Sequence, residues 1–106
     1  ASYRRQRQMC IRDSDTSSSD SVLFISGDRH RGGLYQLTSS SGKNIVEMTS
    51  SSLNLSFTND EEAGPLRVGP TFVQENYGEI LLNKLTNKLT VNLKDNQGNI
   101  VQSVDL

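Results

Sequence analysis

A continuous apolar run, VLFIS at Val22–Ser26, constrains the fold of this chain more than any other feature. Strands exposed on one face alternate apolar with polar residues, and this run shows no such alternation. Unalternating strands are typical of layered sheets covered on both faces. The covers must come from elsewhere in the domain, and a chain of 106 residues, 33% of them hydrophobic, has little apolar sequence to supply them.

The first 14 residues differ from the rest of the chain in charge. The segment ASYRRQRQMCIRDS holds four Arg and one Asp, a balance of +3, whereas the remaining 92 residues have a balance of −4. It resembles the peptide obtained when sequencing-adapter DNA is translated, and no apolar stretch of a signal peptide follows it. We therefore predict that residues 1–21 are an adapter-like scar and a disordered Ser/Asp-rich linker, with the natural start of the frame missing.

The overall charge and the cysteine content limit the classes of partner. A formal net charge of −1 argues against nucleic acid or an anionic membrane as a partner held by bulk electrostatics. No apolar run approaches the roughly 18 residues of a membrane-spanning helix, so we expect no membrane insertion. The lone Cys10 can form no internal disulfide and leaves the compartment open.

The C-terminal third predicts an antiparallel meander. In LTVNLKD the residues Leu89, Val91 and Leu93 alternate with polar ones, which indicates a strand with one buried face. Strands are expected on both sides of it, at Glu79–Leu85 and Asn99–Leu106, joined by short turns.

Between the apolar run and the meander we expect further short elements. Leu34–Thr38 and Asn44–Thr49 are strand candidates separated by a Ser/Gly turn, and Ser50 to Ser52 offer oxygens to cap a short helix at LNLSF. Asn59–Pro70 is expected to be a loop.

The apolar run leads directly into GDRH, which contains the only histidine of the chain. Asp28 and His30, two positions apart on a loop leaving a rigid strand, can point into one site, and both are ligands for Zn, Fe or Mn, while Asp also suits Ca. The alternative is an ordinary turn in which Asp28 bonds nearby amides. Two ligands do not complete a metal site, and the chain has no second His.

Several motifs together resemble the C-terminal end of the PhoD-like (alkaline phosphatase D) metallophosphatases. SGDRH after VLFI is similar to the family's last metal-binding motif, MTSSSL at Met48–Leu53 is similar to its LTSSGL, and NYG at Asn76–Gly78 is similar to its NFG. They occur in the family's order: SGDRH is followed by MTSSSL, then by the segment RVGPTFVQENYGEI, which contains NYG, and then by a terminal meander. The resemblance covers roughly residues 22–106.

The resemblance implies a fold, an activity and a set of site residues. It implies an α/β fold, mostly β in this chain, in which residues 22–106 form the C-terminal part of a layered metallophosphatase sheet ending in the meander. Asp28 would bind one metal and His30 the other of a dinuclear site that hydrolyses phosphate mono- or diesters, with Ca, Fe, Zn or Mn as its metals. Arg29 and Arg31 would hold phosphate oxygens, although they are more often solvated or paired loop charges.

The remaining ligands of that family lie upstream and are absent here, so we expect an incomplete enzyme, inactive without the missing N-terminal part of its domain. Such enzymes are usually periplasmic or secreted. The competing interpretation is a small β-rich binding module with no catalytic role, using the loops Asp28–Gly33 and Asn59–Pro70 as its face. A real stand-alone peptide with a basic arm at Arg4, Arg5 and Arg7 is a third possibility.

Overall fold

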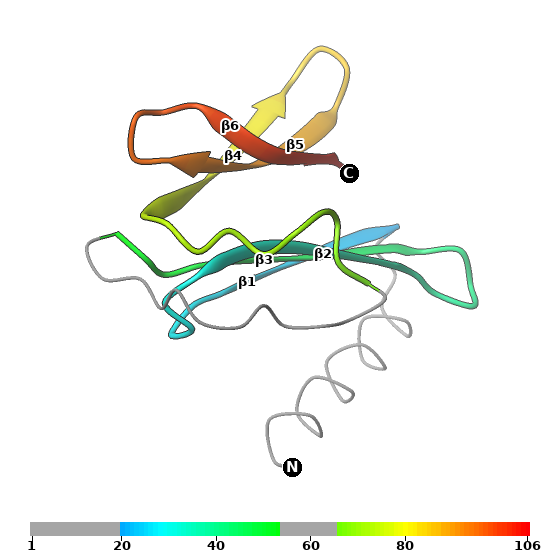
Figure 1. Ribbon diagram of the computed structural model, residues 1–106. Coiled ribbons are helices and arrows are strands. Elements are labelled where there is room, and N and C mark those ends of the chain that lie inside the picture. The colour runs from blue at the N-terminus through cyan, green and yellow to red at the C-terminus, as the bar shows by residue number, and fades with distance from the viewer. Residues whose placement is uncertain (1–19, 54–65) are drawn as a thin grey trace.

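The computed structural model describes residues 20–53 and 66–106, which form six strands in two small sheets (Figure 1). No helix occurs in these residues, and accordingly none that could cross a membrane. The described part is therefore all-β, which agrees with the expectation that this chain is mostly β; the α/β fold that the resemblance implies stays a prediction, and the predicted helix at LNLSF lies outside the described residues except for Leu53. The strands are β1 (Ser21–Ser26), β2 (Gly32–Thr38), β3 (Asn44–Ser50), β4 (Asn76–Asn83), β5 (Lys88–Asp95) and β6 (Ile100–Asp105).

The first three strands form a mixed sheet in the order β1-β3-β2. β1 runs parallel to β3, while β2 runs antiparallel to it and joins it through the Ser/Gly turn that the sequence predicted. In this three-stranded sheet β1, which contains the apolar run Val22–Ser26, lies at an edge and β3 lies at the centre. β3 has buried residues on both faces, whereas Ile25 of β1 is 66% exposed.

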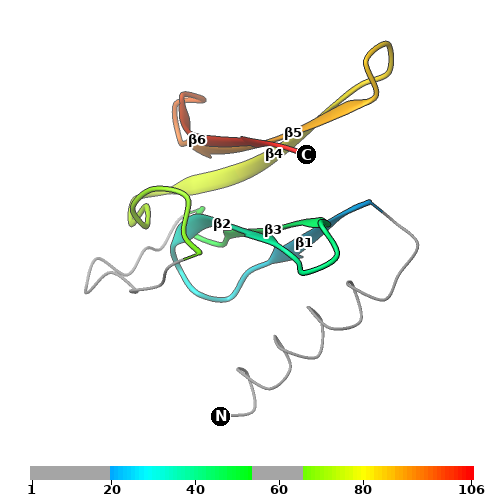
Figure 2. The ribbon, with the colours of Figure 1, turned by 90° about the vertical axis from the view of Figure 1, so that its right-hand side faces the viewer.

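The last three strands form the predicted antiparallel meander, in the order β4-β5-β6. Val91 and Leu93 are completely buried, as their period-two pattern indicated. This meander sheet lies face to face with the mixed sheet, and the two stacked layers are seen from two sides in Figures 1 and 2. The shared core between them comes from both sheets: Leu34, Val46, Met48, Val91, Leu93 and Val104.

The mixed sheet has a second apolar face. Because Val46 and Met48 of β3 point to the meander, the alternation of the strand turns Ile45 to the opposite face. Its register partners Val22 of β1 and Leu37 of β2 lie on that face as well. The mixed sheet thus carries apolar residues on both sides, and Glu47 and Thr49 of β3 share the outer face with Ile45.

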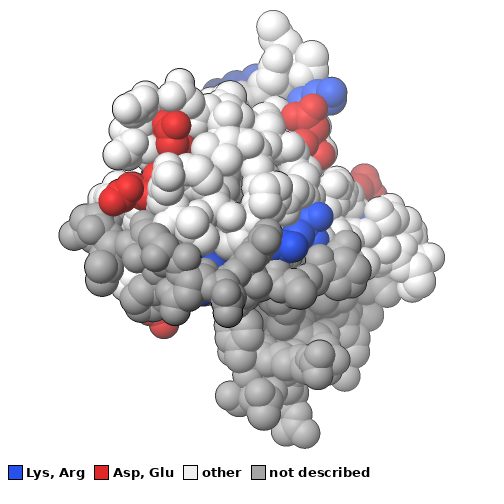
Figure 3. Space-filling view, in the orientation of Figure 1, with Lys and Arg blue, Asp and Glu red and all other residues white. Residues whose placement is uncertain are grey.

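The segment between the two sheets closes the outer edge of β2. The backbone N–H of Gly32 donates to the carbonyl of Phe72 at 2.8 Å, and the N–H of Phe72 returns the bond at 2.8 Å. Further along, Val68 donates to the carbonyl of Leu34. Residues 66–72 therefore act as a partial fourth strand. On the face of the molecule that Figure 3 shows, the charged side chains of the described residues are scattered rather than gathered into one patch.

Replacing Gly32 by alanine is expected to lower the free energy of unfolding by about 1–3 kcal/mol, the usual cost of overpacking. An added Cβ would lie 2.7 Å from Oδ1 of Asn76 and 2.9 Å from Cδ1 of Leu93, both in the core. Urea unfolding of Gly32→Ala measures the loss. Gly27→Ala is the control, because a Cβ there meets its nearest atom at 3.5 Å, an ordinary contact. Equal effects of the two substitutions would contradict this packing.

Acidification is expected to destabilise the meander sheet. Hydrogen bonds from Lys94 and then Asn92 lower the pKa of Glu79, and the backbone N–H of Asn99 is the main cause that lowers the pKa of Asp95. The unfolded chain therefore binds more protons below about pH 5, and the free energy of unfolding falls as the pH drops through the folded-state pKa values. Urea midpoints between neutral and acid pH measure this slope. The double variant Glu79→Gln, Asp95→Asn should flatten it; an unchanged slope would contradict the assignment.

Candidate functional site

The loop of residues 27–31, which contains GDRH, connects two strands that are not neighbours. β1 ends and β2 begins at the same end of the mixed sheet, with β3 between them. Since adjacent strands lie about 4.8 Å apart, the loop must cross roughly 10 Å over the carboxyl end of β3. Ligands in sheets with parallel strands commonly bind beyond the carboxyl ends of those strands, which is where this loop lies.

Ser51, the first residue after β3, holds the crossing loop in place. Its hydroxyl oxygen accepts hydrogen bonds from the backbone N–H groups of Arg29 and His30, each at 2.9 Å. The helix that the serines after Met48 were predicted to cap lies outside the described residues; among those serines, Ser50 is the last residue of β3 and Ser51 binds the loop that arrives from β1. The loop that carries Asp28 and His30 is thus held by Ser51, a residue about 20 positions further along the chain.

Both candidate metal ligands have a left-handed backbone. The φ angles are +68° at Asp28 and +54° at His30, a region that residues with a side chain enter at a cost of roughly 1–2 kcal/mol. Of the residues described, Asn87 in the β4–β5 turn is the other non-glycine with a positive φ. Two such residues within three positions indicate a sharply bent loop, and strained backbones of this kind concentrate at functional sites.

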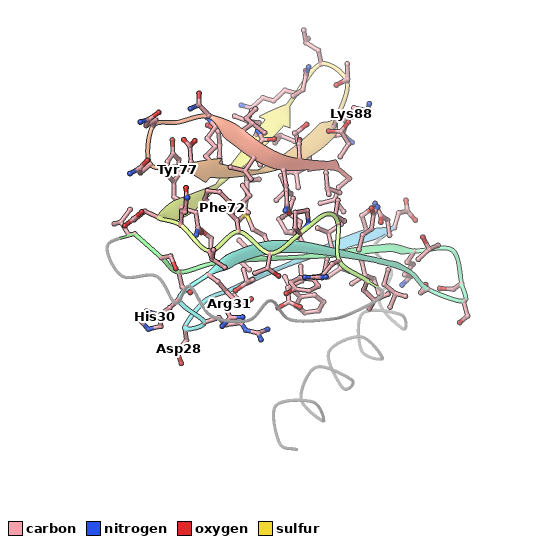
Figure 4. The ribbon with its side chains drawn as sticks, in the orientation of Figure 1. Asp28, His30, Arg31, Phe72, Tyr77 and Lys88 are labelled. Carbon is pink, nitrogen blue, oxygen red and sulfur yellow. The ribbon has the colours of Figure 1, made fainter. Side chains whose placement is uncertain are left out.

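The side chains of Asp28, His30 and Arg31 lie at one end of the mixed sheet, on the side away from the meander (Figure 4). Asp28 is exposed, while Arg29, His30 and Arg31 are half-buried. The structure thus brings the predicted ligands and the predicted phosphate-binding arginines into one short loop. Within residues 20–53 and 66–106, no group of three or more His, Cys, Asp or Glu side chains gathers to hold a metal. The donor types suit Zn, Fe, Mn or Ca, but their number is incomplete.

Asn76 connects this end of the sheet to the meander, a role that the sequence did not reveal. It is 2% exposed, and its Oδ1 accepts a hydrogen bond from the Ser50 hydroxyl at 2.7 Å. Its backbone N–H donates to the carbonyl of Ser52 at 2.8 Å. The motif NYG was noted only as part of the resemblance; its asparagine joins the start of β4 to the chain that leaves β3.

Gly78, the third residue of NYG, allows the two sheets to approach. A Cβ at this position would overlap Sδ and Cε of Met48, so a side chain here would require the end of the Met48 side chain to shift. The motif is therefore explained in this structure by packing, since Asn76 bridges and Gly78 makes room, whereas Tyr77 between them is exposed.

Comparisons with protein-family models, with curated proteins and with solved structures found no match for this chain. The similarity to the PhoD-like phosphatases therefore stays a prediction carried by the motifs themselves.

Removing the Ser51 hydroxyl is expected to loosen the crossing loop. In Ser51→Ala the amides of Arg29 and His30 lose their acceptor, and leaving such groups unsatisfied costs about 1–3 kcal/mol. Amide hydrogen exchange should then accelerate at residues 29 and 30 more than in β5. Ser40→Ala, an exposed serine in the β2–β3 turn, is the matched control. Unchanged protection of the two amides in Ser51→Ala would show that Ser51 does not hold the loop.

Proposed function

We propose that this chain is the C-terminal part of a metal-dependent phosphoesterase, in which Asp28 and His30 supply two ligands of a dinuclear site. The observation that carries the proposal is the loop itself: both residues have a left-handed backbone at the carboxyl end of a parallel strand pair. Asp and His adopt this backbone conformation more readily than most residues, and here it places a carboxylate and an imidazole on one sharp bend beyond the strand ends.

The side chains of the loop would have two roles, metal binding and phosphate binding, according to their chemistry. The carboxylate of Asp28 and the imidazole of His30 would each hold one of two metal ions, with Ser51 fixing the backbone between them. Bound ions supply charge to neutralise the phosphate ester and to activate water. Arg29 and Arg31 would orient phosphate oxygens through charge-assisted hydrogen bonds.

The proposal includes a part of the domain outside this chain. Two protein ligands hold a pair of metal ions poorly, so the other donors are assigned to an N-terminal part of the same domain. On the outer face of the mixed sheet Ile45 is buried, whereas Val22 and Leu37 are half-buried and leave some apolar surface for that part to cover. Without it we expect no hydrolysis. On the resemblance alone, we assign the parent enzyme to the periplasm or the extracellular space.

The test begins with the source DNA upstream of the codon for Val22. We expect the frame to continue into segments bearing further Asp, Asn and His residues. The extended protein should hydrolyse p-nitrophenyl phosphate or its bis-ester in the presence of divalent metal. Since even outer residues of metal sites contribute about 10–100-fold, Asp28→Asn and His30→Asn should each lower kcat at least about 100-fold. Asp20→Asn, an exposed acid just before β1, is the control and should leave kcat unchanged.

The glycine variants separate a ligand role from a turn. Asp28→Gly and His30→Gly relieve the positive φ, so each should keep or raise the free energy of unfolding while hydrolysis is lost. If activity survives these changes, or if the genome places a start codon before ASYRRQRQMCIRDS, the phosphoesterase proposal is wrong. The chain would then be the small β-rich binding module, and GDRH its turn.

A further inference from the structure

The described strands leave three sheet edges open, and they differ in how they are protected. β1 and β6 are six residues long, and the pairing of β5 with β6 is interrupted by an irregularity between Leu93 and Lys94. Short or bulged edges pair poorly with other chains. The edge of β2 is already occupied by residues 66–72. β4 is eight residues long, pairs with β5 in continuous register, contains no proline, and has its first residue, Asn76, bonded to the carbonyl of Ser52.

β4 also carries exposed apolar side chains on both of its faces. Ile80, Leu81 and Leu82 are 40%, 51% and 57% exposed, and no other strand has three such residues in succession. Ile80 lies on the face with Val91, its register partner, and Leu81 lies on the opposite face with Thr90. A long regular edge with apolar side chains is the kind that natural sheets otherwise cover or charge.

The sequence of β4 is complementary to itself in one register. In a two-fold antiparallel pair, residues that oppose each other lie on the same face, so the axis must pass at a residue. An axis at Leu81 opposes Leu81 with its copy and sets each Ile80 against Leu82. It places Glu79 opposite the uncharged Asn83. An axis at Glu79 would oppose two carboxylates, an axis at Ile80 would oppose Glu79 to Leu81, and an axis at Leu82 would oppose Ile80 to Lys84.

The charge next to the apolar stretch is already neutralised within one copy. Glu79 accepts a hydrogen bond from Nζ of Lys94 at 2.8 Å and another from Nδ2 of Asn92 at 3.1 Å. Its carboxylate is therefore held along its own sheet, and pairing at β4 does not bring an unpaired charge against the partner. This charge pattern favours a second copy of the chain over an oppositely charged protein.

We propose that β4 is a dimerisation edge, at which two copies of this chain pair through a two-fold axis at Leu81 into one six-stranded antiparallel sheet. Each copy has one β4, so the pairing closes at a dimer rather than growing. The contact of a single strand is smaller than a standard interface of about 800 Å² per partner. The dimer is therefore concentration-dependent. This inference does not rest on the phosphoesterase proposal.

Sedimentation equilibrium over a range of protein concentrations tests the proposal. The 106-residue chain should convert from monomer to dimer as the concentration rises. Leu81→Lys places two like charges at the axis and should leave a monomer at every concentration. Ile100→Lys on β6 is the matched control, since Ile100 is 58% exposed, and should still dimerise. Far-UV circular dichroism of each variant checks that the strands are retained.

A cross-linking experiment covers the case in which Leu81→Lys fails to fold. Directly opposed antiparallel residues have Cα atoms about 4.5–5.5 Å apart, within disulfide range. In a Cys10→Ser background, Leu81→Cys should therefore oxidise to a covalent dimer, whereas Val101→Cys on β6 should not. A chain that stays monomeric, one that forms larger oligomers, or one that loses dimerisation through Ile100→Lys alone would overturn the proposal. Equal cross-linking at Val101 would do so as well.

Discussion

The pairing of β1 with β3 in parallel, with β2 on the far side of β3, is the constraint on which the candidate site depends. It forces five residues to travel across the end of β3, and they do so by bending at Asp28 and His30. The chain leaving β3 passes beneath that crossing, which is why the Ser51 hydroxyl meets two backbone amides. Asn76 then ties the same end of the sheet to the meander. Topology, rather than local preference, thus places the acid and the imidazole.

The positions of the strands were predictable because they follow from local patterns. The alternation around Val91 correctly indicated a strand with one buried face, and the Ser/Gly turn correctly separated β2 from β3. The place of each strand within its sheet was not predictable in the same way. An apolar run such as Val22–Ser26 indicates that both faces of its strand are shielded from water, but it does not indicate which strand lies beside it. Here β3 takes the centre, since it buries residues on both faces.

The candidate site could be predicted only in part, for a related reason. Asp28 and His30 are recognisable as ligand types from their letters alone, because carboxylate and imidazole chemistry does not depend on the fold. Ser51 and Asn76 are not, since a serine or an asparagine acquires its role from the groups that the fold brings to it. The run of serines after Met48 resembled a helix cap because serine is strongly preferred at helix N-termini. In the structure Ser51 binds the loop that follows β1, and Ser50 binds Asn76 at the start of β4.

The apolar surface of the two sheets has two different origins. On the outer face of the mixed sheet Ile45 is buried while Val22 and Leu37 are half-buried, and covering the rest of such a face requires another layer of the same domain. At β4 the exposed residues accompany open backbone groups on a regular edge, and these require another strand. An apolar face is buried by another layer, whereas an open edge is paired by another strand. A covering layer from an N-terminal part would therefore leave the edge of β4 available for pairing. The proposed dimerisation at β4 and the proposed completion of a metal site therefore use different surfaces of the protein.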